Sequence, residues 1–276
     1  MSTEPDQYGV IGHPVSHSWS PFIHGMFAKQ TGQLITYRLH DVTPEAFRRY
    51  VLDFFSRGGR GLNVTVPHKL AAAGLANELT PRAERARAVN TLAIQDHRIL
   101  GDNTDGAGLV HDLRANLNVT IRNRRVLIVG AGGATRGVLA PLLALEPAEL
   151  VIANRTAERA VTLAADFQDL GAIRGCGLNE LGESAFDVVI NATSASLSGE
   201  VPAISASVIG AQTVCYDMAY GKNDTAFVRW AREHGCARAL QGWGMLVEQA
   251  AESFYIWRGV RPQTAPVLAA LQERAG

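Results

Sequence analysis

Short runs of apolar, often β-branched residues alternate along most of the chain with longer segments whose apolar residues recur at helical spacing. Each helix predicted near the N-terminus opens with a serine or threonine followed by proline, a combination typical of helix starts. Asp96 and His97 separate the last two strands of this part and predict a hairpin. The strands predicted here are 8–12, 34–39, 61–66, 92–94 and 98–100, and the helices open at Ser20, Thr43 and Thr80.

A second alternation of strands and long helices begins near residue 106. Long helices between strands are typical of a parallel sheet that is wound with helices on both faces. The pattern therefore predicts an α/β fold in two parts. Two C-terminal helices, one ending near residue 257 and one starting near residue 265, could pack on either part. The other predicted elements are helices at 108–117, 134–145, 157–167 and 226–234, and strands at 125–129, 150–153, 187–190, 213–216 and 237–240.

Charge and cysteine content exclude several kinds of partner. Lys plus Arg and Asp plus Glu both number 26, so the formal net charge is zero. We expect neither nucleic acid nor a membrane as a partner, because both favour a basic face. The three cysteines are widely spaced, which predicts no disulfide framework and no metal site. The N-terminus is polar and no apolar run approaches the ~20 residues of a membrane helix, so we expect a cytoplasmic protein.

A glycine-rich turn follows the predicted strand at 125–129 and precedes a predicted helix. Glycines in this position allow a tight turn and let backbone N–H groups approach a pyrophosphate at the helix N-terminus. The fingerprint is imperfect, because Thr135 occupies its third glycine position. The order of strand, turn and helix nevertheless predicts a dinucleotide site. Its expected residues are Gly130, Ala131, Gly132, Gly133 and Ala134.

The end of the next strand indicates which dinucleotide binds. An NAD site uses an acidic residue there for the ribose 2′-hydroxyl, whereas a 2′-phosphate is bound by arginine. This chain has Asn154, Arg155 and Thr156 at that point and Arg159 one turn later, and no carboxylate. The alternative is that Thr156 only caps a helix and both arginines are solvated. Given the glycine turn, the sequence favours NADP.

A set of polar residues in the first third contains more specific chemistry than a packed core needs. Residues 61–66 predict a short buried strand that Pro67 ends, and Lys69 follows it. Asn90 and Asp105 return from later segments. Because ligands of open α/β sheets bind beyond the carboxyl ends of the strands, this set predicts an acid/base site. Taken singly, Lys69 would be a surface lysine and Asp105 a helix cap.

Several motifs together resemble the shikimate dehydrogenase family. They occur in the order typical of that family and span nearly the whole chain. Two departures are visible, His13 where asparagine is usual and Trp19 where lysine is common, and neither replaces a ligand. Trp19 could alter which substrates enter. The matching motifs are residues 16–21, 63–69, 88–91, 101–106, 130–134, 154–156, 216–218 and 244–250.

The resemblance implies NADP-dependent reduction of 3-dehydroshikimate to shikimate, in the route to aromatic amino acids. It implies a substrate domain at 1–105, completed by helices in 242–276, and a Rossmann-like NADP domain with a doubly wound parallel sheet at 106–241, with substrate in the cleft between them. The catalytic pair would be Lys69 and Asp105. Substrate ligands would be Ser18 and Ser20 for the carboxylate, Thr65, Asn90 and Gln249 for the hydroxyls, and Tyr220, while Met218 and Gly242 would line the nicotinamide side.

The chemistry of the residues agrees with this activity. Ketone reduction needs a proton at the developing alkoxide, and a lysine can donate it. Burial would lower the pKa of Lys69 toward neutrality, whereas Asp105 would oppose that change. Two alternatives remain: a quinate/shikimate dehydrogenase with broader substrate or NAD use, and a non-catalytic NADP-binding sensor. The sequence leaves the choice between a monomer and a homodimer open.

Overall fold

The computed structural model describes residues 4–275, and the strands within them form two six-stranded sheets. The chain divides into two units, each of which contains one sheet. The first unit comprises the described residues up to Gly108 and the C-terminal segment Val247–Glu273, and the second comprises Leu109–Leu246 and the residues from Arg274 onward. The C-terminal helices, which the apolar pattern alone left unassigned, thus belong largely to the first unit.

The sheet of the first unit places several loops at one edge. β1 and β3 are parallel, β5 is antiparallel to β3, and β6 is antiparallel to β5. The ends of β1, β3 and β6 therefore lie at the same edge as the start of β5. The strand order is β2 (Ile35–Asp41), β1 (Asp6–Gly12), β3 (Gly59–Val64), β5 (Thr91–Gln95), β6 (Arg98–Asp102) and β4 (Glu78–Leu79).

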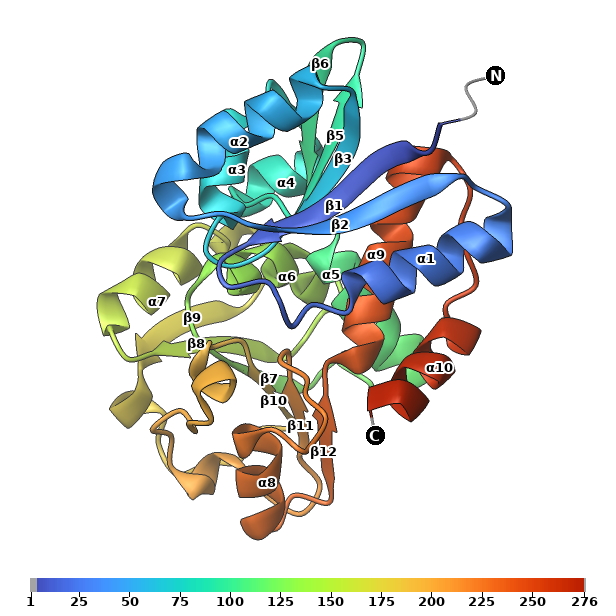
Figure 1. The fold of residues 1–276 in the computed structure, drawn as a ribbon. Coiled ribbons are helices and arrows are strands. Elements are labelled where there is room, and N and C mark those ends of the chain that lie inside the picture. Colours follow the sequence, from blue (N-terminus) through green and yellow to red (C-terminus); the bar gives the residue numbers. More distant parts are fainter. Residues whose placement is uncertain (1–3, 276) are drawn as a thin grey trace. The chain divides into compact units, whose positions relative to one another are not determined.

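Helices cover both faces of this sheet (Figure 1). Ile11, Leu62 and Val64 point to the face covered by α2 and α3, where they pack with Phe47 and Val51. Helices α1 and α9 lie on the opposite face. The helices of this unit, including three that extend into the second, are α1 (Ser20–Thr31), α2 (Pro44–Ser56), α3 (Lys69–Leu75), α4 (Pro81–Ala86), α5 (Asp105–His111), α9 (Trp243–Arg258) and α10 (Ala265–Ala275).

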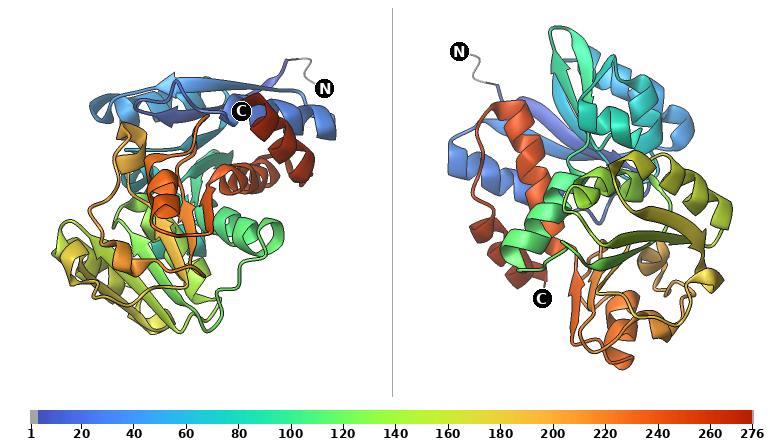
Figure 2. Two further views of the ribbon diagram at one scale, coloured as in Figure 1. Left: turned by 90° about the horizontal axis from the view of Figure 1, so that it is seen from below. Right: turned by 180° about the vertical axis from the view of Figure 1, so that it is seen from behind.

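Helix α9 is held against the sheet by the side chain of Trp257. Its indole Nε1 donates to the Leu92 carbonyl at 3.0 Å, and its ring lies 4.8 Å from that of Tyr8. A Cβ on Gly61 would lie 2.3 Å from the same Nε1, so only glycine leaves room for the indole. In both views of Figure 2 the C-terminal segment, orange to red, lies beside the blue α1, and Gln30 bonds the backbone of Gln263 twice.

We expect Gly61→Ala to destabilise the protein by about 1–3 kcal/mol, because the added methyl displaces Trp257 from β3. Gly74→Ala is the matched control: its Cβ would meet nothing within 4 Å, and it lies in α3, where alanine favours the helix. Thermal unfolding measures both variants. An unchanged melting temperature for Gly61→Ala would contradict this account of the docking of α9.

His24 of α1 is fully buried among aromatic rings. It stacks on Tyr37 at a centroid distance of 4.3 Å and contacts Phe27, Phe254 and Trp257. Within the described residues neither ring nitrogen has a hydrogen-bond partner. Burial lowers the pKa of His24 to about 3, so the folded state keeps the ring neutral.

This depressed pKa predicts acid sensitivity. Between pH 6.5 and about 3 the unfolded chain binds a proton that the folded chain does not, so stability falls as pH falls through this window. We expect the loss to reach several kcal/mol, at about 1.4 kcal/mol per pH unit. His24→Phe keeps the stacking and removes the titration. Denaturant unfolding from pH 7 to 4 should show a smaller decline for this variant, and an identical decline would contradict the assignment.

The sheet of the second unit is entirely parallel and carries helices on both faces (Figure 1). Val126, Ile128 and Ile152 pack with α6 and α7, whereas Leu127 and Val151 face the side that holds α8. The strand order is β12 (Arg238–Gln241), β11 (Val214–Asp217), β10 (Val188–Asn191), β7 (Arg125–Val129), β8 (Glu149–Asn154) and β9 (Ile173–Gly177), and the helices are α6 (Gly133–Leu143), α7 (Ala157–Ala165), α8 (Ala226–Glu233) and a π-helix at Asp112–Asn116.

Three of the differences from the prediction have a physical reason in the structure. Helix α3 was not predicted, because its short Ala-rich sequence has no amphipathic pattern. Strand β9 was also not predicted, because its glycines disfavour a strand; a Cβ on Gly175 would lie 2.2 Å from the backbone of Ala160, so close packing of α7 requires glycine there. Ser20 was predicted to cap α1, but it is the first helical residue and Trp19 precedes it without a side-chain cap bond.

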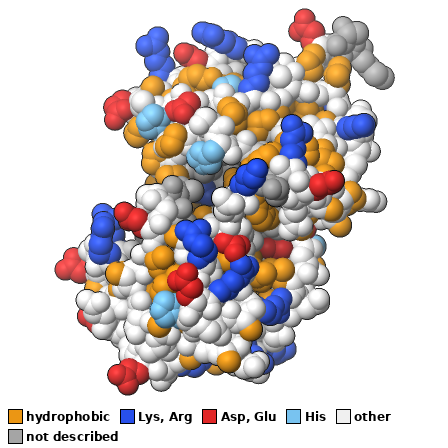
Figure 3. All heavy atoms as spheres, turned by 60° about the horizontal axis from the view of Figure 1, so that its bottom comes forward, with side chains coloured by type: hydrophobic (Ala, Val, Ile, Leu, Met, Phe, Trp, Pro, Cys, Tyr) orange, Lys and Arg blue, Asp and Glu red, His pale blue; other side chains and the backbone are white. Residues whose placement is uncertain are grey.

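Charged side chains of both signs are interspersed on the face drawn in Figure 3, which agrees with the zero formal net charge. Among the described residues, no helix combines the length and apolarity that crossing a membrane requires. No group of three or more His, Cys, Asp or Glu in that part of the chain is arranged to hold a metal ion.

Candidate functional site

The loops after β1 and β3 place four predicted site residues at the same edge of the first sheet. Ser18 and Ser20 follow β1, and their hydroxyls lie 3.1 Å apart. Thr65 directly follows β3, and its methyl fills the space where a Cβ of Gly12 would be. Within the described residues, the Thr65 hydroxyl makes no hydrogen bond to the protein. Lys69 begins α3 one turn later. This edge thus presents hydroxyl groups and an ammonium group together.

Lys69 and Asp105 form a close ion pair. Lys69 Nζ donates to Asp105 Oδ2 at 2.5 Å. The Lys69 side chain is 14% exposed and the Asp105 side chain 6% exposed, so the pair is largely enclosed but still reachable. Asp105 is the first residue of α5, which starts just after β6 ends at the same sheet edge. The fold therefore joins two residues that lie 36 positions apart.

Asn90 holds the other oxygen of Asp105. Its Nδ2 donates to Asp105 Oδ1 at 2.8 Å and to Gln249 Oε1 of α9 at 3.3 Å. Asn90 Oδ1 accepts the backbone N–H of Thr104 at 2.8 Å, which fixes the orientation of the amide. Lys69, Asp105, Asn90 and Gln249, four of the predicted site residues, are thus linked by hydrogen bonds.

The loop that carries Asp105 is braced by its neighbours. Asp102 accepts two bonds from Arg82 of α4, at 2.6 and 2.8 Å, and a third from the backbone N–H of Asn103. Asn103 in turn accepts the backbone N–H of Asp105 at 3.1 Å. A bidentate pair between a half-buried guanidinium and a buried carboxylate favours a single loop conformation. The carboxylate of Asp105 is therefore held in place before any ligand arrives.

The predicted dinucleotide turn lies between β7 and α6 in the second unit. Gly130 has a φ of +110°, and a Cβ there would lie 3.1 Å from Thr193. A Cβ on Gly132 would meet nothing within 4 Å, so the start of α6 is open. The first backbone N–H groups of a helix have no partner within it. The residues Gly130, Ala131, Gly132, Gly133 and Ala134 therefore fit a phosphate group at the N-terminus of α6.

Thr135 explains the imperfect glycine fingerprint. Its side chain is fully buried and its hydroxyl donates to the Gly130 carbonyl at 2.8 Å. The threonine points away from the open side of the turn and holds the turn closed. The departure from the glycine pattern therefore leaves the proposed phosphate position clear.

The end of β8 presents cationic and neutral polar groups. Arg155 and Arg159 are both exposed, and the Asn154 amide donates to the Thr156 carbonyl at 2.9 Å. Thr156 precedes α7 but its side chain makes no capping bond. The arrangement fits a 2′-phosphate, because two exposed guanidinium groups follow β8 and no carboxylate stands at the end of the strand itself.

Three more predicted residues meet at the ends of β11 and β12. A Cβ on Gly242 would lie 2.7 Å from the Met218 carbonyl oxygen, so glycine is needed for this approach. The Tyr220 ring lies 4.7 Å from that of Trp243, and burial raises the pKa of Tyr220 to about 12. Tyr220 is therefore a neutral hydroxyl at physiological pH.

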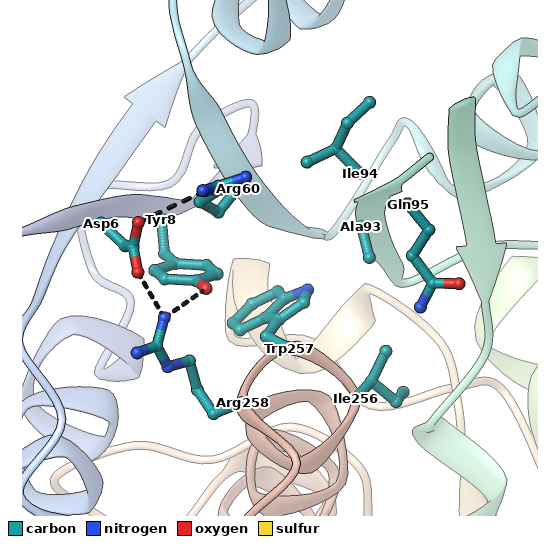
Figure 4. A pocket seen from close by; sticks show the side chains of 9 residues that line it. All are labelled: Asp6, Tyr8, Arg60, Ala93, Ile94, Gln95, Ile256, Trp257 and Arg258. Carbon is teal, nitrogen blue, oxygen red and sulfur yellow. Dashed lines mark hydrogen bonds and ion pairs between the residues drawn. The ribbon is translucent and has the colours of Figure 1, made fainter. Parts of the chain in front are cut away.

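A pocket of about 280 Å³ in the first unit lies at the other end of β1 and β3 (Figure 4). Asp6 lies between Arg60 and Arg258, and Arg258 also bonds the Tyr8 hydroxyl at 3.2 Å. Burial would raise the pKa of Asp6, but the two arginines outweigh it and lower that pKa. Because Asp6 already pairs with both cations, we interpret this cluster as a connection between the end of α9 and β1.

One unit has a parallel sheet with a glycine turn, and the other has a lysine–aspartate pair. Together these features define a nicotinamide-dinucleotide oxidoreductase with a separate substrate unit. Residues 10–92 match the family described as shikimate dehydrogenase substrate binding domain. Residues 113–201 match shikimate / quinate 5-dehydrogenase, and residues 242–272 match the shikimate 5'-dehydrogenase C-terminal domain. The chain belongs to the shikimate dehydrogenase family.

Individual relatives agree with this membership. The shikimate dehydrogenase (NADP(+)) of Methylococcus capsulatus is 54% identical over 271 residues, which cover 98% of this chain and 97% of the relative. A crystal structure of shikimate dehydrogenase with NADP+ is 31% identical, covers 100% of this chain and 98% of its own, and has a TM-score of 0.88. A crystal structure of the Thermus thermophilus shikimate 5-dehydrogenase in complex with NADP(H) and shikimate is 31% identical. The match covers 98% of this chain and 100% of that chain, with a TM-score of 0.86.

The sequence pattern did not assign a role to several buried polar residues behind Asn90. Asn63, Thr91 and Thr104 occur in the motifs that resemble the family, and Ser253 lies on α9. All four are buried and hydrogen-bonded to one another or to Asn90. The available signal for Ser253 was its position four residues after Gln249, which places both on one helix face.

Proposed function

We propose that this chain catalyses the reversible NADP-dependent reduction of 3-dehydroshikimate to shikimate in aromatic amino acid biosynthesis. The observation that carries the proposal is the enclosed Lys69–Asp105 pair at the edge of the first sheet, 2.5 Å apart. The hydroxyl and amide groups around it suit a substrate with several ring hydroxyls. Membership of the family agrees with both the reaction and the cofactor.

Lys69 is the proton donor in this proposal. Its ammonium group gives a proton to the oxygen of the developing alkoxide, and in the oxidation direction the neutral amine accepts it. Asp105 orients Lys69 through Oδ2 and receives the Asn90 amide on Oδ1. Asn90, Thr65 and Gln249 bond the ring hydroxyls, Ser18 and Ser20 bond the carboxylate, and Tyr220 contributes a further hydroxyl to the substrate.

NADPH supplies the hydride when it is bound. The turn Gly130–Ala134 holds the pyrophosphate with backbone N–H groups, and Arg155 and Arg159 hold the 2′-phosphate together with Asn154 and Thr156. Met218 and Gly242 line the nicotinamide side. Residues 106–241 form the cofactor domain in this proposal, and residues 1–105 with helices from 242–276 form the substrate domain.

The proposal includes a cytoplasmic location and a small-molecule substrate as the main partner, with the protein acting as a monomer or a homodimer. Nucleic acid is not a partner in this proposal, because the equal numbers of acidic and basic residues provide no cationic excess.

The test is a spectrophotometric assay of nicotinamide reduction, with shikimate and quinate each offered with NADP and NAD. We expect the highest kcat/KM for shikimate with NADP. Equal or better turnover of quinate with NAD would instead support the broader quinate/shikimate enzyme. Tight NADP binding without oxidation of shikimate would support a non-catalytic sensor and overturn the proposal.

A further inference from the structure

Ser253 is a polar residue of α9 that lies one helical turn after Gln249. Its neighbours on the helix, Ala250, Ala251 and Phe254, are all buried. The Ser253 side chain is fully buried as well. Burying a hydroxyl group costs free energy unless it is hydrogen-bonded, so its partners are informative.

The hydroxyl group of Ser253 joins three other segments of the first unit. Asn63 Nδ2 of β3 donates to it at 2.9 Å. The Thr91 hydroxyl at the start of β5 lies 2.8 Å away, and the Thr104 hydroxyl just before α5 lies 3.2 Å away. The Ser253 hydroxyl has one proton, which it can donate to the Thr91 oxygen or to the Gln249 carbonyl oxygen 3.0 Å away. One oxygen atom therefore connects α9 to β3, β5 and the loop that leads to Asp105.

These contacts lead from Ser253 through Thr91 and Asn90 to Asp105 in three short steps. Ser253 donates its proton to the Thr91 oxygen at 2.8 Å, which leaves the Thr91 proton to be donated to Asn90 Oδ1 at 2.9 Å. Because Asn90 Oδ1 accepts this bond, the amide turns Nδ2 toward Asp105 and donates to its Oδ1. Asp105 Oδ2 accepts the bond from Lys69 Nζ. If the Asn90 amide rotated, its oxygen would face the carboxylate of Asp105 and repel it. The hydroxyl groups of Thr91 and Ser253 thus oppose that rotation.

Ser253 also controls the placement of Gln249. The two residues lie one helical turn apart on α9, and Gln249 Oε1 accepts Asn90 Nδ2 at 3.3 Å. A shift of α9 at Ser253 would therefore move Gln249 and loosen Asn90 at the same time.

We propose that Ser253, acting through Thr91, is a positioning residue that fixes the Asn90 amide and Gln249 relative to the Lys69–Asp105 pair. The inference rests on the proposed function, since Lys69 and Asp105 are catalytic only in that reaction. Ser253 does not contact the pair itself.

The test compares Ser253→Ala, Thr91→Val and Thr91→Ser in the full-length protein, with kcat, KM and melting temperature measured for each. Thr91→Val keeps the shape of the side chain and removes the hydroxyl, whereas Thr91→Ser keeps the hydroxyl. We expect Ser253→Ala and Thr91→Val to lower kcat for shikimate by roughly 10- to 100-fold, because catalytic groups that shift slightly lose rate steeply. Thr91→Ser should restore most of the rate, and KM for NADP should stay unchanged in all three.

Two controls separate positioning from general stability. Ser56→Ala removes a similar bond, from a serine hydroxyl to the Asp53 carbonyl, on the exposed end of α2, and should leave kcat unchanged. The double variant Ser253→Ala/Thr91→Val should be little worse than either single variant, because both remove the same connection. A lowered melting temperature with a wild-type kcat would overturn the inference, as would additive losses. Wild-type protein that fails to oxidise shikimate would overturn the proposed function instead.

Discussion

Lys69→Ala is expected to lower kcat for shikimate oxidation by roughly 10²- to 10⁴-fold, the usual contribution of a positioned acid or base. Alanine removes the ammonium group that lies 2.5 Å from Asp105 Oδ2, and no other lysine lies at this edge of the sheet in the described chain. The dinucleotide turn belongs to the other unit, so the affinity for NADP should change little. Steady-state kinetics and NADP titration measure the two effects separately.

The matched control is Lys29→Ala, which removes an exposed lysine from α1 in the same unit. We expect wild-type kcat for this control. If Lys69→Ala also kept wild-type turnover, Lys69 would have no part in proton transfer, and the pair with Asp105 would be only structural.

Arg155→Asp is expected to lower kcat/KM for NADP by about 100-fold, since bonds to a charged group contribute about 1.5–3 kcal/mol and the new carboxylate repels the 2′-phosphate. NAD has no 2′-phosphate and presents a ribose hydroxyl that aspartate can accept. Its kcat/KM should therefore stay the same or rise. The ratio of the two values, measured at one ionic strength, reports the change in preference.

Arg114→Asp makes the same charge change at an exposed position of the second unit, outside the dinucleotide turn. We expect it to leave the ratio unchanged, which excludes a general effect of net charge. Equal losses for NADP and NAD in Arg155→Asp would mean that other residues read the 2′-phosphate.

Local sequence signals were sufficient where one short segment contains the whole feature. The hairpin at β5 and β6 follows from Asp96 and His97, which both adopt positive φ, a conformation that Asp, Asn and His tolerate better than most residues. Strand β7 and the glycine turn were predicted because β-branched residues and glycines have strong local preferences. Strand β9 was not predicted, because glycine disfavours a strand locally. Gly175 is needed there because the backbone of Ala160 in α7, outside the strand, packs closely against it.

By itself, the sequence determined the α/β alternation, the dinucleotide turn, the absence of a carboxylate at the end of β8 and, through its motifs, the family. These features depend on backbone preferences and on residue types within a few positions. Only the tertiary structure decided which atoms of Lys69, Asp105 and Asn90 bond one another, that α9 docks through Trp257 on Gly61, and that Ser253 reaches Thr91. Such contacts join segments that lie far apart in the sequence, 190 positions in the case of Asn63 and Ser253, and depend on how the strands pair and which helix face is buried.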